Sequence, residues 1–270
     1  RKNLYWHASC IVSNRFFFLG FFQMDRALYL AMSGGRQTMH AQSVHANNLA
    51  NVSTTGFRSD FEQARSMQVY GEHFPSRVYA MTENPATRFD SGSLIQTGRD
   101  LDVAMQDTGF IAVLDEQGQE AYTRAGDLQI TVAGQLVTGS GLAVLGADGP
   151  IFLPPIDKLT IGTDGTISIV PQGGGPAEIA VINQMKLVDP DTRDLKKGRD
   201  GLIHGRDNQV FDRAPNAQLV SGFLEGSNVN AVEEMTHIMS LSRRFELNIK
   251  VMDTVRNNEN ASARILQRNA

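Results

Sequence analysis

The sequence predicts an α+β protein in which paired N- and C-terminal helices form a coiled-coil-like core domain, with an all-β domain inserted between them. Two observations predict this class. Apolar residues recur every three or four positions near both ends of the chain, whereas they alternate with polar residues in the middle. The middle also holds Asp148-Gly149 and Asp164-Gly165, and such Asp-Gly pairs are typical of β-hairpins.

Residues 1–23 differ from the rest of the chain, because they hold the only Trp, the only Cys (Cys10) and five of the fourteen Phe. Arg15 interrupts the apolar run and no Ala-x-Ala-like site follows it, so the pattern does not fit a secretory signal peptide. The run is also shorter than the roughly 20 apolar residues that a membrane span needs. The sequence predicts a non-native upstream extension, a start at Met24, and no membrane insertion.

Residues 24–56 are predicted to form the N-terminal helix of the core domain. Seven of its positions are spaced by four and three residues in alternation, which is typical of a heptad seam. These positions are Leu28, Met32, Gly35, Met39, Gln42, Ala46 and Leu49. The adjacent glycines Gly34 and Gly35 each cost about 1 kcal/mol in a helix. A helix of this composition needs a partner to be stable.

Residues 216–270 are predicted to contain that partner, the C-terminal helix. Its apolar positions step by three or four residues. They are Val232, Met235, Ile238, Leu241, Phe245, Ile249, Met252 and Val255. Ser227 or Asn228 is the predicted N-cap, and Glu233 and Glu234 follow at the positive end of the helix dipole.

The chain between the helices is predicted to have two parts. Residues 57–89 show no clear period and contain Pro75 and Pro85, so they are predicted to form an extended arm. Residues 90–215 contain short alternating apolar runs separated by Gly-containing turns. This pattern predicts a β-rich outer domain of about ten strands.

The stretch "HANNLANVSTTGF", His45–Phe57, places three asparagines at the end of the N-terminal helix. Asparagine favours helix ends and turns over helix interiors. One interpretation is helix termination, with Asn51 leaving the helix and Gly56 taking the left-handed C′ position. The other is that Asn47 and Asn48 lie in an interface, where side-chain amides fix register and partner choice. The sequence leaves both interpretations open.

Sequence motifs for chemistry or nucleic-acid binding are absent. The net charge of −4 gives no electrostatic footprint for nucleic acid. There is no nucleophile elbow, phosphate-binding loop or His-Glu-x-x-His pair. Asp189–Gly201 is rich in aspartate but lacks the glycine and glutamate that a calcium loop requires, so it is predicted to be a solvated turn. We therefore predict no catalytic residue, no cofactor, no metal ligand and no small-molecule substrate.

Three segments carry recognisable motifs in order. Ala46–Phe61 reads "ANNLANVSTTGFRSDF", and Phe223–Thr254 reads "FLEGSNVNAVEEMTHIMSLSRRFELNIKVMDT". Between them, Leu101–Gly146 reads "LDVAMQDTGFIAVLDEQGQEAYTRAGDLQITVAGQLVTGSGLAVLG". Together these segments resemble the flagellar basal-body rod and hook proteins, and the resemblance extends over residues 24–270. The opening "MDRALYLAMSGGRQTM", Met24–Met39, is most similar to the proximal-rod type.

The resemblance implies a structural subunit of the bacterial flagellar basal-body rod, which polymerises through its terminal helices and transmits torque from motor to hook. Its expected partners are copies of itself, other rod and axial proteins, and the flagellar type III export apparatus. Its expected location is the rod that crosses the periplasm, reached without a cleaved signal peptide. The alternatives are a distal-rod or hook-type axial protein and a phage-tail-like structural protein.

Combining the seam with the resemblance predicts a set of subunit-interface residues. They are Leu28, Met32, Met39, Asn47, Asn48, Leu49, Asn51, Met235, Ile238, Phe245, Ile249 and Met252. The apolar members are expected to supply affinity by burial, and the asparagines to set the stagger between subunits.

Overall fold

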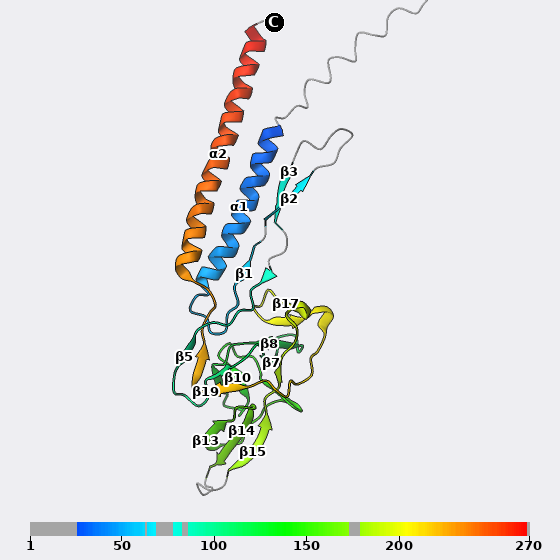
Figure 1. The fold of residues 1–270 in the computed structure, drawn as a ribbon, viewed down its shortest axis with the longest axis vertical. Coiled ribbons are helices and arrows are strands. Elements are labelled where there is room, and N and C mark those ends of the chain that lie inside the picture. The colour runs from blue at the N-terminus through cyan, green and yellow to red at the C-terminus, as the bar shows by residue number, and fades with distance from the viewer. Residues whose placement is uncertain (1–25, 63, 69–77, 83–85, 173–178, 269–270) are drawn as a thin grey trace, which may run out of the picture. The chain divides into compact units, whose positions relative to one another are not determined.

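The computed structural model describes residues 26–62, 64–68, 78–82, 86–172 and 179–268 (Figure 1). Two helices and many antiparallel strands make the protein α+β, which confirms the predicted class. The extension predicted at residues 1–23 and the start predicted at Met24 lie outside the described residues.

The chain divides into two compact units. The first contains the described residues of Arg1–Gln42, Ala64–Thr82 and Met239–Ala270, and the second those of Ser43–Gln63 and Glu83–Ile238. The domain boundaries predicted from composition stay a prediction, because compactness alone does not show which parts fold independently.

Helix α1 spans Arg26–Ala50 and helix α2 spans Ala231–Arg268. The N-cap of α2 is Asn230, whose Oδ1 accepts hydrogen bonds from the N–H groups of Val232 at 3.1 Å and Glu233 at 3.4 Å. The predicted cap, Ser227 or Asn228, was therefore two or three residues too early. Across the described residues, neither helix is long and apolar enough to cross a membrane.

Besides its helical segments, the described part of the first unit contains one strand pair. Strands β2 (Ala64–Gln68) and β3 (Val78–Thr82) pair antiparallel over five residues. They fall within the arm predicted at 57–89, as do the short strands β1 (Asp60–Phe61) and β4 (Ala86–Thr87), which pair with each other in the second unit.

Two further strand pairs join distant parts of the sequence within the second unit. Strand β5 (Leu94–Gln96) pairs with β20 (Phe223–Glu225), and β6 (Val103–Met105) pairs with β19 (Leu219–Ser221). Both pairs are antiparallel. The segment just before α2 is therefore bound to the segment that begins the β-rich region.

A five-stranded antiparallel sheet has the order β16-β7-β8-β18-β17. Its strands are β7 (Phe110–Leu114), β8 (Glu120–Thr123), β16 (Leu187–Val188), β17 (Leu195–Lys197) and β18 (Ile203–Gly205). Two short 3-10 helices, η1 (Thr192–Asp194) and η2 (Arg206–Asn208), lie beside its last strands in the sequence. Buried side chains pack on both faces of this sheet.

Shorter hairpins complete the second unit. Strand β9 (Leu128–Ile130) pairs with β10 (Leu136–Thr138), and β11 (Leu145–Gly146) pairs with β12 (Gly149–Pro150). Strands β13 (Ile156–Ile161), β14 (Thr166–Pro171) and β15 (Ala180–Gln184) form a three-stranded sheet. The two Asp-Gly pairs fall at the β11–β12 and β13–β14 turns, which confirms both predicted hairpins.

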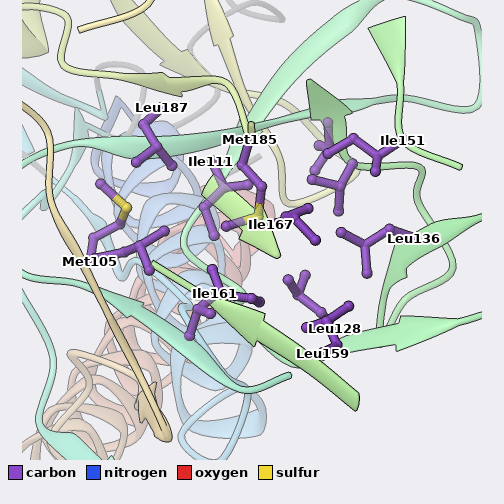
Figure 2. Packing of buried hydrophobic residues seen from close by; sticks show 14 of the residues in the cluster. Met105, Ile111, Leu128, Leu136, Ile151, Leu159, Ile161, Ile167, Met185 and Leu187 are labelled. Atoms are coloured by element: carbon purple, nitrogen blue, oxygen red, sulfur yellow. The ribbon is translucent and has the colours of Figure 1, made fainter. Parts of the chain in front are cut away.

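The hydrophobic core lies in the second unit (Figure 2). It gathers apolar side chains from strands β6 to β10, β13, β14, β16 and β19 and from the segments between them. The labelled members are Met105, Ile111, Leu128, Leu136, Ile151, Leu159, Ile161, Ile167, Met185 and Leu187. Side chains this well buried contribute about 1.5–3 kcal/mol each, so the second unit has its own source of stability.

Candidate functional site: the junction of the terminal segments

The asparagine patch ends helix α1 through local hydrogen bonds. Asn51 donates from Nδ2 to the carbonyl of Asn47 at 2.9 Å, and the hydroxyl of Thr54 donates to Asn51 Oδ1 at 3.1 Å. A carbonyl left over at the helix end thereby gains a partner. Gly56 follows with φ +68°, as predicted. The predicted exit of Asn51 from the helix and the left-handed conformation of Gly56 are confirmed, but the predicted C′ position of Gly56 is wrong, because α1 ends at Ala50, six residues earlier.

Asn48 faces inward and is only 1% exposed. Its Oδ1 accepts from the N–H of Asp60 at 2.9 Å, and its Nδ2 donates to the carbonyl of Asp60 at 2.9 Å. The same Nδ2 lies 3.2 Å from Glu234 Oε1 at the start of α2. One side-chain amide therefore binds the backbone at β1 and also links α1 to α2. The amide of Asn48 thus has its hydrogen-bond partners within the subunit.

The turn after the patch has no room for a side chain at Gly56. A Cβ built there would lie 2.3 Å from the carbonyl carbon of Arg124, and the Gly56 N–H donates to the carbonyl of Glu225 at 2.8 Å. This close approach brings the next basic residue, Arg58, into the interior. The glycine is required both by its positive φ and by its neighbours.

A buried charge cluster lies at this point. Arg58 Nη2 donates to Glu225 Oε1 at 2.7 Å, and Arg124 Nη1 donates to Glu225 Oε2 at 2.9 Å. Each of the three side chains is only 1% exposed. Glu225 Oε1 also accepts from the N–H of Gly92 at 2.8 Å, and Arg124 Nη2 donates to the carbonyl of Asp107 at 2.7 Å.

The cluster holds two cations and one anion, so it is not neutral by itself. Burial lowers the pKa of the Arg124 guanidinium, with the Arg58 charge acting in the same direction and the Glu225 carboxylate opposing it. Arg124 also lies over the ring of Phe110, 4.9 Å from its centroid. Such a cluster contributes less to stability than to fixing one geometry, and it tolerates loss of a partner poorly.

Asn228 binds the chain on the other side of Arg58. Its Oδ1 accepts from the N–H of Ser59 at 2.8 Å, and its Nδ2 donates to the carbonyls of Arg88 at 2.9 Å and Asp90 at 3.1 Å. One side-chain amide in the segment before α2 therefore binds the backbone at two places, Ser59 and the stretch from Arg88 to Asp90. Residues 58–59 and 225–228 are joined by both an ion pair and a backbone contact.

Lys197 covers the same turn from strand β17. Its Nζ donates to the carbonyl of Arg58 at 2.7 Å, pairs with Asp60 Oδ2 at 3.1 Å, and lies 4.0 Å from the centroid of the Phe57 ring. The ammonium group therefore neutralises one carboxylate and stacks on one aromatic face. These contacts attach the turn to the five-stranded sheet.

A pair of histidines joins the two helices next to Asn48. His45 Nδ1 and Glu234 Oε2 are 2.5 Å apart, and the rings of His45 and His237 stack with centroids 4.9 Å apart at 13°. His237 Nε2 also lies 3.9 Å from Glu233 Oε1. We define the junction as these contacts together with those of Asn48, Gly56, Arg58, Arg124, Lys197, Glu225 and Asn228.

The helices also lie side by side in the first unit, and they run antiparallel (Figure 1). A Cβ at Gly34 would lie 3.4 Å from Asn248 Oδ1, and one at Gly35 would lie 3.9 Å from the Phe245 ring. The glycines predicted to weaken α1 thus bring α2 close. The less exposed positions repeat by three and four, and we call them the inner seam: Ala31, Gly35 and Thr38 on α1, and Leu241, Phe245, Asn248, Met252 and Val255 on α2.

The structure places the predicted interface residues in three groups. The exposed group is Met32, Met39, Asn47, Met235 and Ile249, and the partly buried group is Leu28, Leu49, Asn51, Ile238, Phe245 and Met252. Asn48 alone is fully buried. The predicted α1 seam was one position too late at Met32 and Met39, because Ala31 and Thr38 are the buried residues there.

Sequence reasoning missed several junction residues. Arg58, Arg124, Glu225 and Asn228 all stand in the quoted segments but were not assigned to the site. Arginine beside a left-handed glycine turn, with a second acidic motif elsewhere, could have suggested a buried pair. For Arg124 no neighbouring turn gives such a signal, and its partner Glu225 is 101 residues away.

Metal-ligating side chains also meet at one place in the described residues, outside the junction. Asp115, Asp200 and His204 have ligand atoms within 4.8 Å of one another. Asp115 Oδ1 already accepts from the N–H groups of Gln117 and Gln119, and Asp200 Oδ2 pairs with His204 Nε2 at 3.0 Å. These bonds hold two turns, one of which lies in the Asp189–Gly201 segment predicted to be a solvated turn.

Three sequence-family models match segments of this chain. Residues 28–58 match "Flagella basal body rod protein", and residues 104–169 match "Flagellar hook protein FlgE/F/G D1 domain". Residues 220–265 match "Flagellar basal body rod FlgEFG protein C-terminal". The first and last of these segments hold the two halves of the junction, with Arg58 in one and Glu225 in the other.

Whole-length relatives agree with the segment matches. The chain is 38% identical over 249 residues to the flagellar basal-body rod protein FlgF of Salmonella typhimurium, covering 90% of this chain and 99% of that protein. The chain belongs to the flagellar basal-body rod proteins. This rod protein is 37% identical to FlgF of Escherichia coli K12 over the same shares, and 32% identical to FlgG of Bacillus subtilis, covering 86% and 95%.

Family membership makes this rod protein a structural subunit of the flagellar basal body. It also implies assembly with other rod or axial components. The relatives are named as structural rod proteins, and none of the three carries the name of an enzyme.

Proposed function

We propose that this subunit polymerises through its two terminal helices to build the proximal rod, the drive shaft that passes torque from motor to hook. One observation carries the proposal. The helices are long, at 25 and 38 residues, yet among their described side chains only three apolar residues are fully buried. These are Ala31, Ala41 and Val255.

Eleven large apolar side chains of the described helices are exposed in the single chain. They are Tyr29, Leu30, Met32, Met39, Val232, Met235, Met239, Leu247, Ile249, Val251 and Ile265. A helix that buries so little apolar area gains little from tertiary packing, which is the main source of helix stability in proteins. Neighbouring subunits would supply the missing contacts.

The energetic scale favours several contacts per subunit. Complete burial of one large apolar side chain yields about 1.5–3 kcal/mol, whereas association costs at least about 4 kcal/mol in lost freedom of motion. Two or three exposed side chains would only offset that cost. Eleven exposed side chains on the helices leave enough surplus for a stable polymer, if about half of them become buried.

The inner seam supports the finer architecture that we propose, a coiled-coil-like core made of α1 and α2 with the β domain inserted. Its alternating spacing of three and four is the heptad pattern. We extend the proposal to the route of assembly: the flagellar type III apparatus exports the unfolded chain, without a cleaved signal peptide, into the rod that crosses the periplasm. The weak burial of both helices supports this, because such segments unfold easily.

Hydrogen exchange tests the proposal. The purified chain is compared with the same chain in isolated basal bodies, from cells in which it replaces the native copy. We expect fast exchange in both helices of the free chain and strong protection in the rod. The strands of the hydrophobic core should be protected in both samples and serve as the internal control. A chain that is absent from basal bodies, or helices equally protected in both samples, would contradict the proposal.

A further inference from the structure

A second row of four side chains, three of them apolar and exposed, flanks the inner seam in the first unit. On α1, Met32 and Met39 each follow a seam residue by one position, and they are 54% and 58% exposed. On α2, Ser242 and Ile249 likewise follow Leu241 and Asn248. We call Met32, Met39, Ser242 and Ile249 the outer stripe.

Both halves of the outer stripe lie on the same side of the helix pair. Each helix is right-handed, so the residue after a seam residue is turned by about 100° in the same sense, viewed from that helix's own N-terminus. Because α1 and α2 run antiparallel, these two turns lead to one common side (Figure 1). The exposed methionines of α1 and Ile249 of α2 therefore form one face.

The pattern of this face indicates more than two helices in the finished assembly. A two-stranded coiled coil needs apolar residues only at the two seam positions of each heptad. Helices that face the core of a larger bundle add a third apolar position beside the seam. Met32 and Met39, spaced by seven residues, occupy that third position in successive heptads of α1.

Acidic residues lie beside the stripe only on α2. Helix α1 has no Asp or Glu between Arg26 and Ala50, and Arg36 stands between its two stripe methionines. On α2, Glu246 and Asp253 flank Ile249. Across the described ranges, no ion pair of Arg36, Glu246 or Asp253 is found within the subunit. Arg36 is opposite in charge to Glu246 and Asp253, while Lys250 and Arg256 are basic residues of α2 near Ile249.

We propose that the α1 half of the outer stripe packs against the α2 half of the outer stripe on a second copy of this chain. Arg36 of one copy then faces Glu246 and Asp253 of the other. A contact between two different surfaces repeats from copy to copy and builds a ring or a helical polymer, whereas a self-complementary contact stops at a dimer. The inference rests on the proposed function and specifies which faces meet.

Disulfide trapping between two cysteine variants tests the orientation. Both carry Cys10→Ser; one adds Met39→Cys and the other Ile249→Cys. They are produced together, with distinct tags, in cells lacking the native gene, and the basal bodies are isolated and oxidised. We expect a disulfide between the two differently tagged chains. A dimer of the Met39→Cys chain with itself at equal yield, or no disulfide although both chains are present, would overturn the proposal.

Charged substitutions give an independent test with a matched control. Ile249→Glu and Met39→Glu should each lower the amount of chain in basal bodies at least tenfold and leave the melting temperature of the purified chain unchanged. Leu247→Glu is the control, because it places the same charge at another exposed residue of α2, 59% exposed against 38% for Ile249 and about 200° further around the helix. Equal losses for Leu247→Glu and Ile249→Glu, or no loss for Ile249→Glu, would overturn the inference.

A charge exchange tests the edge contacts. Arg36→Glu alone should reduce incorporation, and combining it with Glu246→Arg and Asp253→Arg in one chain should restore it. Failure of the exchange to restore incorporation would contradict the proposed pairing. The wild-type chain separates the two proposals: its absence from basal bodies would refute the proposed function, whereas normal wild-type incorporation together with normal Ile249→Glu incorporation refutes only this inference.

Discussion

The junction and the outer stripe invert the usual distribution of side chains. At the junction, Arg58, Arg124 and Glu225 are charged and buried, whereas along the outer stripe Met32 and Met39 are apolar and exposed. Buried charges need partners in one fixed geometry, so they specify the fold of the single subunit. Exposed apolar groups do not specify the fold of the single subunit, and they gain a defined geometry only when a partner covers them. The difference separates residues that fold this chain from residues that we propose assemble it.

Removing the central carboxylate should break the junction with the largest effect. Glu225→Ala leaves two guanidinium groups buried without their anion, so we expect a loss of about 3–5 kcal/mol in the free energy of unfolding. Urea denaturation followed by circular dichroism measures it. The exposed Glu246→Ala is the control and should stay within about 0.5 kcal/mol of wild type. A small effect at Glu225 would mean that water compensates the arginines.

The turn at Gly56 should be nearly as sensitive. Gly56→Ala places a methyl group against the backbone of Arg124 at a residue with φ +68°, so we expect a loss of about 2–4 kcal/mol. Gly118→Ala is the matched control, since its φ is +78° but no atom lies within 4 Å of the added carbon. It should cost only about 1 kcal/mol. Similar values for both glycines would show that the backbone near Arg124 moves aside.

The asparagine patch allows a comparison between adjacent residues. Asn48→Ala removes three hydrogen bonds, including those to the N–H and carbonyl of the partly buried Asp60, so we expect about 2–3 kcal/mol of destabilisation. The neighbouring Asn47→Ala changes an exposed side chain and should have an effect below about 0.5 kcal/mol. Equal effects of the two substitutions would remove Asn48 from the junction.

These contrasts show where sequence patterns were informative. The α+β class, both helices and both Asp-Gly hairpins follow from local periodicity and turn chemistry, which act over a few residues. The phase of the seam did not follow, because Met32 and Ala31 are both apolar and only packing decides which faces α2. The spacing in the sequence selected the methionines for the seam. The close approach of the helices at Gly34 and Gly35 instead favours the smaller alanine.

The junction was only partly predictable for a different reason. A buried arginine looks like a surface arginine in a sequence, because its burial depends on a partner far along the chain. Asn48 illustrates the same limit: its position in the patch was recognised, yet its acceptor and donor at Asp60 depend on a turn at Gly56. Motifs located the two halves of the site, but not the contacts between them.

Tyr122 extends the comparison to pH. Burial raises the pKa of its phenol well above the usual 10, and the hydroxyl donates to Glu120 at 3.0 Å and accepts from the N–H of Phe211 at 2.9 Å. A raised folded-state pKa stabilises the fold below pH 10, and that stability is lost as the pH rises above 10. Tyr122→Phe should therefore cost about 1–2 kcal/mol at pH 7 and less at pH 11. A cost that is independent of pH, measured by urea denaturation, would contradict this.

The outer stripe should show the smallest effect on the isolated subunit. Met39→Ala removes an exposed side chain, so the free energy of unfolding should change by less than about 0.5 kcal/mol. The seam variant Phe245→Ala is the comparison and should be more destabilising, because its ring lies against Gly35. Denaturation of the two purified variants measures the difference. A larger loss for Met39→Ala would place the methionine in the fold of the single chain.

The ion pair between Arg58 and Glu225 spans 167 residues of sequence and therefore limits the order in which parts of the chain can fold. Contacts between residues so far apart form late, because the intervening chain must first be available and closed into a loop. A chain that emerges N-terminus first from a ribosome or a narrow conduit cannot close the junction until residue 225 of 270 has appeared. For most of such an emergence, helix α1 therefore has no partner helix. The junction stays open, and the chain can remain unfolded there, until the last sixth of the sequence has emerged.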